Sequence, residues 1–148
     1  MNKSLRGILA GGLLSLSPLL LLAQAAKPVP APVKPGLLAS LDRGKLVYTQ
    51  QCLTCHQADA GGVPNMTPPL IKTKWVLGDK TTLVQVVLKG MTGNIDVDGD
   101  RYHNVMAPHS ELSDQQIADV LTYVRNNFGN KARAVTAAEV KAIRAQTK

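Results

Sequence analysis

The sequence predicts a small all-α domain of about four to five short helices. Three stretches place apolar residues at helical spacing. One of them and a fourth stretch near the C-terminus begin with a capping box, which marks the start of a helix. The connecting segments are rich in glycine and proline, which disfavour regular structure. The length of 148 residues fits a single domain.

The first 36 residues are predicted to precede this domain. Residues 1–25 have a basic start, an apolar run and the small-x-small sequence Ala23-Gln24-Ala25, which is the pattern of a secretory signal peptide. Residues 26–36 are rich in proline and predict an extended linker. We expect cleavage after Ala25 and a periplasmic domain. The alternative is a signal that is retained as a membrane anchor.

The domain is predicted to span residues 37–130. Its first helix is expected over 41–51, with Ser40 as the N-cap and with Gly44 on the apolar face. Residues 58–73 contain three prolines and two glycines, and they predict a loop. A second helix is expected over 80–89.

The second half of the domain contains the clearest helix signal. The Asp98-Gly99 step predicts a small hairpin turn. Ser113 and Gln116 form a capping box before an apolar stripe, and they predict a helix over 114–127. The same capping pattern recurs inside the basic extension, residues 131–148, and predicts a short last helix there.

The charge of the chain is unevenly distributed. The net charge is +7, but residues 37–130 hold eight basic and nine acidic residues. The excess lies in the linker and in the extension, where a solvated end is expected. The alternatives for the extension are steering of an acidic partner and contact with anionic lipid. The folded domain lacks a basic patch with stacking aromatics, so we expect no binding of nucleic acid.

Both cysteines and one of the three histidines lie in the sequence Cys-Leu-Thr-Cys-His, residues 52–56. Zinc binding, a redox disulfide and covalent haem attachment all use such residues. A structural zinc site needs four ligands, and the spacing of the other histidines matches no zinc ribbon. A thiol oxidoreductase places its motif between a strand and a helix, whereas here a helix is predicted to end at the motif. The motif therefore favours haem, with the other two as alternatives.

Haem attachment gives each position of the motif a role. Cys52 and Cys55 would form thioethers with the two vinyl groups of one porphyrin, and His56 would then lie under the iron as an axial ligand. The predicted export signal supports this interpretation, because such attachment takes place on exported chains. The chain contains no further cysteine that could mispair.

Three stretches extend the pattern beyond this motif. They are "GKLVYTQQCLTCH", "PPL" at 68–70, and "ELSDQQIADVLTYVRNNFG", which carries Tyr123 at an aromatic position. With them, residues 37–130 resemble a class I cytochrome c. The resemblance implies the cytochrome c fold, with its helices around one covalently bound haem c, and one-electron transfer without catalysis.

The resemblance also implies roles for single residues. Gly44 should lie where the first helix crosses the last core helix, opposite the Val120 and Val124 stripe. The carbonyl of Pro68 should accept a hydrogen bond from the second ring nitrogen of His56, which would orient the ring. Trp75 is expected either to bond a haem propionate or to pack.

Met106 is the residue that the resemblance implies as the sixth ligand of the iron. It lies just before the capping box of the helix over 114–127, where the family keeps its methionine. Met66 lies within reach by chain length alone, and core packing is expected for Met91. His103 and His109 flank Met106 and are the alternative ligands.

These patterns predict a periplasmic one-electron carrier, either a monomer or a subunit of a complex. Its partners would be redox proteins, namely a dehydrogenase or a terminal reductase or oxidase. One alternative is a cytochrome subunit dedicated to a quinoprotein dehydrogenase. The other is a gas-binding or peroxidatic haem protein with an open sixth position.

Overall fold

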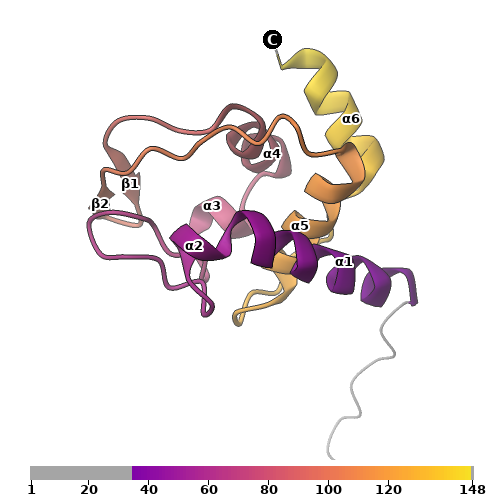
Figure 1. Cartoon of the computed structure of the whole chain (residues 1–148), viewed down its shortest axis with the longest axis horizontal. Helices are drawn as coiled ribbons and strands as arrows, with labels where there is room; N and C mark the ends of the chain where they lie inside the picture. The colour runs from indigo at the N-terminus through magenta and orange to yellow at the C-terminus, as the bar shows by residue number, and fades with distance from the viewer. Residues whose placement is uncertain (1–34, 148) are drawn as a thin grey trace, which may run out of the picture. The chain divides into compact units, whose positions relative to one another are not determined.

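Six α-helices and one β-hairpin make up residues 35–147, the part of the chain that the computed structural model describes (Figure 1). The elements are α1 (Pro35–Gln51), α2 (Leu53–His56), α3 (Lys74–Leu77), α4 (Lys80–Lys89), β1 (Ile95–Val97), β2 (Asp100–Tyr102), α5 (Asp114–Asn126) and α6 (Ala137–Gln146). The predicted all-α class is confirmed. The predicted signal peptide lies outside the described residues, as does the linker up to residue 34. None of the described helices has the length and apolarity needed to span a membrane.

The start of the first helix was predicted wrongly. The helix α1 begins at Pro35, not near residue 41. Proline suits the first position of a helix, because its fixed φ is helical and its missing N–H has no partner there in any case. Ser40 is therefore not an N-cap. Its hydroxyl instead donates to a carboxylate oxygen of Asp119 at 2.6 Å.

The later elements lie where the sequence places them. The helix α4 has the predicted bounds, and Asp79 caps it by accepting from the Thr82 N–H. Asp98 and Gly99, which connect β1 to β2, both have positive φ, as a tight hairpin turn requires. The capping boxes of α5 and α6 are both formed. The helices α2 and α3 were not predicted.

The helices α1 and α5 cross at Gly44. A Cβ atom there would lie 2.1 Å from the backbone oxygen of Asp119 and 2.7 Å from Cβ of Tyr123. Only glycine permits so close an approach. The predicted crossing is confirmed, but the facing residues are Asp119 and Tyr123, not Val120 and Val124. Arg43 reinforces the crossing through two hydrogen bonds to the Asp119 carboxylate, at 2.7 and 2.9 Å.

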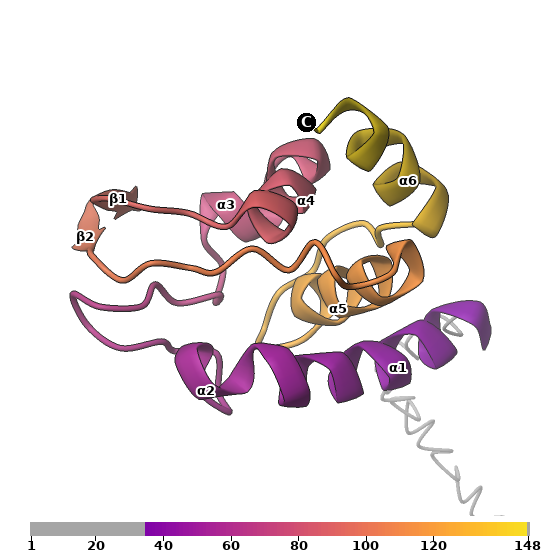
Figure 2. The same ribbon diagram turned by 45° about the horizontal axis from the view of Figure 1, so that its top comes forward.

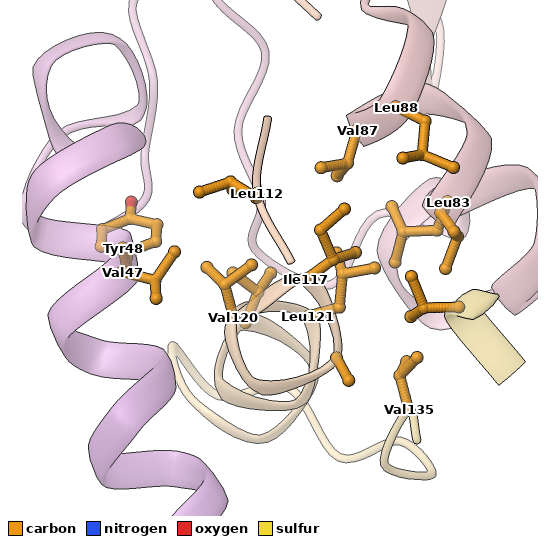
Figure 3. Close-up of a cluster of buried hydrophobic side chains, with 14 of the residues drawn as sticks. Val47, Tyr48, Leu83, Val87, Leu88, Leu112, Ile117, Val120, Leu121 and Val135 are labelled. Atoms are coloured by element: carbon orange, nitrogen blue, oxygen red, sulfur yellow. The ribbon is translucent and has the colours of Figure 1, made fainter. Parts of the chain in front are cut away.

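The main hydrophobic core surrounds α5 (Figure 3). Val47 and Tyr48 approach it from α1, and Leu83, Val87 and Leu88 come from α4 on another side. Ile117 of α5 is fully buried between these groups. A second, smaller cluster is formed by the hairpin residues Ile95, Val97 and Tyr102, with Trp75 and Met91 packed against it. The helix α5 is thus the central element against which the other core helices pack.

The extension does not behave as a solvated end. Its helix α6 lies beside α4 and α5 (Figure 2) and buries Val140 completely. The preceding segment is attached to α5, because the Thr122 hydroxyl both donates to the carbonyl and accepts from the N–H of Val135, each at 3.0 Å. The prediction failed because an alanine-rich, basic stretch shows its few buried positions poorly in sequence.

Candidate haem site

The Cys-x-x-Cys-His motif follows α1 directly and forms the short helix α2, with Cys52 as the residue before its start. The Cys52 N–H donates to the carbonyl of Tyr48, and the His56 N–H donates to the carbonyl of Cys52, both at 2.9 Å. Residues three and four positions apart lie on the same face of a helix. The local fold therefore brings the two thiols and the imidazole to one side of the chain.

That side borders a cavity of about 350 Å³. Cys52, Cys55 and His56 form one wall of the cavity, and Met106 contributes from the loop that precedes α5. Most other lining residues are apolar: Pro68, Pro69, Leu70, Trp75, Val76, Leu83, Val86, Val87, Met91, Ile95, Val97, Val105, Leu112, Val120, Leu121 and Val124. A large apolar cavity with a few polar groups on its wall is typical of a cofactor site.

The ring of His56 has a defined partner. Its Nδ1 lies 3.1 Å from the backbone oxygen of Pro68. A carbonyl can only accept, so Nδ1 carries the proton in this contact and Nε2 keeps its lone pair. Burial lowers the pKa of His56; the Pro68 bond opposes this effect, and His109 adds to it. The neutral imidazole that results is the form that binds a metal.

Gly62 permits the loop to present Pro68 in this way. Its φ is +66°, and a Cβ atom there would lie 2.3 Å from the oxygen of Thr67 and 2.7 Å from that of Pro68. The Gly62 N–H also donates to the carbonyl of His56 at 3.1 Å. The sequence predicted only a loop here. The Gly61-Gly62 pair was the available signal for such a close approach.

The three methionines among the described residues differ in their positions. Met106 and Met91 both line the cavity, and their backbones exchange two hydrogen bonds of 2.9 Å. Met66 is half exposed and does not line the cavity. Gly90 makes the methionine pairing possible, because a Cβ atom there would lie 2.2 Å from the carbonyl oxygen of Met106.

The two remaining histidines lie in different surroundings. His109 lines the cavity, and its Nδ1 is 3.3 Å from a carboxylate oxygen of Glu111. His103 is exposed, and its Nδ1 lies 2.8 Å from the side-chain oxygen of Asn94. Trp75 lines the cavity and donates its ring N–H to the backbone oxygen of Asp96 at 3.3 Å.

The thiol of Cys52 does not have the electrostatics of a redox cysteine. Burial raises its pKa to about 11, with a smaller effect from Cys55. Reactive cysteines in disulfide oxidoreductases have a lowered pKa, because the thiolate is the nucleophile. The raised pKa of this partly buried thiol argues against the redox-disulfide alternative.

Residues 41–128 match the family model for cytochrome c. The chain belongs to the cytochrome c family. Members carry a covalently bound c-type haem with its iron, and Cys52 and Cys55 are in place to attach it. The apolar cavity beside these two thiols fits this group, since the porphyrin is large and apolar. Members of the family transfer electrons.

Three relatives show the range of proteins in which similar domains occur. Cytochrome c-552 of Thermus thermophilus is 34% identical in an alignment of 120 residues that covers 75% of this chain and 80% of that protein. The cytochrome c subunit of the quinone alcohol dehydrogenase of Gluconacetobacter polyoxogenes is 39% identical over 68% of this chain. The Cbb3-type cytochrome c oxidase subunit CcoP of Azospirillum brasilense is 32% identical over 63%. The matched region covers only 22% and 30% of these two subunits.

Proposed function

We propose that this protein is an exported one-electron carrier whose haem iron is held by His56 and Met106. The observation that carries the proposal is the composition of one cavity wall and its surroundings. The neutral imidazole of His56, oriented by Pro68, lies at the cavity beside the thiols of Cys52 and Cys55. The thioether-bearing residue Met106 lines the same cavity from the loop that precedes α5. A haem with a His and a Met ligand transfers single electrons at a raised potential.

The chain contributes to this function by holding its groups in place and by excluding water. Pro68 orients the ring of His56, and such a bond to a ligand histidine raises its basicity. The apolar lining lowers the local dielectric, which disfavours the more highly charged state of a buried redox centre. The pairing of Met91 with Met106 holds the Met106 backbone at the cavity.

Met106 is favoured over Met66 and His103 by its surroundings. Met66 is half exposed outside the cavity, and His103 is exposed and bonded to Asn94. Met91 and His109 also line the cavity, so they are the residues to test against Met106.

The partner that we favour is a membrane or periplasmic oxidoreductase of the respiratory type. Similar domains occur in the cytochrome c subunits of quinone alcohol dehydrogenases and in a subunit of a Cbb3-type oxidase. A dedicated dehydrogenase subunit is therefore the second candidate. Co-purification of the chain, expressed in its own host, with a dehydrogenase would support this candidate. A chain that purifies alone and exchanges electrons with several partners would support the free carrier.

The test of ligation is an absorption spectrum of the ferric and ferrous protein, matured in a host that attaches haem. We expect a sharp low-spin ferrous spectrum and the weak red band of ferric iron bound to a thioether. Met106→Ala should abolish the red band. The matched controls are Met66→Ala and Met91→Leu, which should retain it.

Two outcomes would contradict the proposal. Loss of the band in Met91→Leu but not in Met106→Ala would move the sixth ligand to Met91. A high-spin ferrous form that binds carbon monoxide rapidly would indicate an open position, and thus a gas-binding or peroxidatic protein.

A further inference from the structure

One guanidinium from α6 binds the segment that connects the Met106 loop to α5. Arg144 donates from Nη1 to the carbonyl of Ser110 at 2.8 Å, from Nη2 to that of Leu112 at 2.6 Å, and from Nε to the Asp114 carboxylate at 2.7 Å. All three nitrogens of the side chain are thus used by residues 110–114. A planar fork with this many donors can hold several acceptors in one fixed arrangement, which a lysine cannot reproduce.

The bound segment begins four residues after Met106. Between Met106 and this segment, the N–H of His109 donates to the carbonyl of Val87 at 2.8 Å. On the other side of Met106, the N–H of Asn104 donates to the carbonyl of Met66 at 3.0 Å. The loop that carries Met106 is therefore attached on its first side to the loop after the haem motif, and on its last side to α4 and α6.

The helix α6 is itself held firmly enough to serve as an anchor. Its Val140 is fully buried, and Lys80 of α4 forms an ion pair with Glu139. The segment before it is bonded to α5, because Arg125 donates to the carbonyl of Arg133 and the N–H of Ala132 donates to that of Arg125. Movement of α6 away from the loop would require several of these contacts to break.

The match to the family model for cytochrome c ends at residue 128, so Arg144 and α6 lie beyond that model. We propose that Arg144 is a positioning residue for the sixth ligand: it holds residues 110–114 so that the loop keeps Met106 at the iron. The inference rests on the proposed ligation by Met106. The extension then serves the redox site through the loop, without touching the haem.

The first test measures how easily the loop releases the iron. Imidazole binds ferric iron only after Met106 leaves, so its affinity reports the opening of the loop. We expect Arg144→Ala to tighten imidazole binding by about tenfold, which corresponds to about 1.4 kcal/mol. Arg144→Lys should give a smaller change, and Lys141→Ala, an exposed basic residue on the same helix, should leave the affinity unchanged.

The second test does not depend on the iron. Hydrogen exchange of the Met106 N–H, which donates to the carbonyl of Met91, should become faster in Arg144→Ala. Amides in the middle of α5 should exchange as in the parent protein. Equal acceleration at both places would mean that Arg144 only stabilises the whole fold, and it would overturn the proposal.

The two proposals can fail separately. If Met106→Ala loses the red band but Arg144→Ala changes neither imidazole affinity nor exchange at Met106, the ligation stands and the role of Arg144 is refuted. If Met106→Ala retains the red band, the ligation is refuted, and the positioning role falls with it.

Discussion

Replacement of Gly44 by alanine tests the crossing of α1 and α5. The new Cβ atom would lie 2.1 Å from the backbone oxygen of Asp119, whereas ordinary contacts begin near 3.4 Å. The helices would have to separate by about 1.3 Å, and no change of rotamer can relieve a clash with backbone. Because the clash is with backbone, we take the upper end of the cost of overpacking, about 3 kcal/mol, and the better helix propensity of alanine returns about 1 kcal/mol. We expect a net loss of about 2 kcal/mol in the free energy of unfolding.

The same helix provides a matched control. Gly36 also lies in α1, and a Cβ atom there has no neighbour within 4 Å. Gly36→Ala should therefore leave stability unchanged or raise it by up to about 1 kcal/mol. Both variants would be unfolded in guanidinium chloride and followed by far-ultraviolet circular dichroism. A Gly44→Ala protein as stable as the parent would refute the close crossing.

Three further substitutions test other contacts. Burial alone would raise the pKa of Asp119, but hydrogen bonds from Arg43, Ser40 and Gln115 hold it below its usual value. The contribution of the Asp119 carboxylate to stability is therefore complete above its unfolded pKa of about 3.9, and it declines as the pH falls through the lower, folded pKa. Asp119→Asn should flatten the dependence of urea unfolding on pH below about pH 4. Asn130→Ala should cost about 2–3 kcal/mol in the same assay at neutral pH, because the buried side chain bonds one N–H and two carbonyls. Thr122→Val should lower the free energy of unfolding by about 1–3 kcal/mol, because it leaves the N–H and the carbonyl of Val135 without their partner. Limited proteolysis should then cleave the segment before α6 faster than in the parent protein.

The parts of the fold that sequence predicts well are those with local signals. The capping box of Ser113 and Gln116 is a contact within four residues, and so the start of α5 was predicted correctly. The bounds of α4 follow from its apolar spacing and from Gly90 after its end. The haem motif is likewise local, because its five consecutive residues are enough to predict haem attachment.

The missed features have ambiguous or very short local signals, or they depend on neighbours distant in sequence. Pro35 was interpreted as part of an extended linker because proline is ambiguous between a linker and the first residue of a helix. The four residues of α3 are too few to show a periodic pattern, and Thr73 caps them through a single bond to Val76. The fixation of α6 depends on Arg144, whose partners lie about 30 residues earlier, and no spacing rule indicates such pairs.

The crossing of α1 and α5 closes a large loop of chain. Arg43 and Asp119, which bond there, are 76 positions apart, and the haem motif, the hairpin and the Met106 loop all lie between them. Because the entropy of closing a loop grows only with the logarithm of its length, insertions at the hairpin tip should add little to this penalty. A break at the Asp98-Gly99 turn would give two fragments, each with one of the two crossing helices. The interface between α1 and α5 would then lie between two separate fragments. We therefore expect the two fragments to associate through this interface when they are mixed.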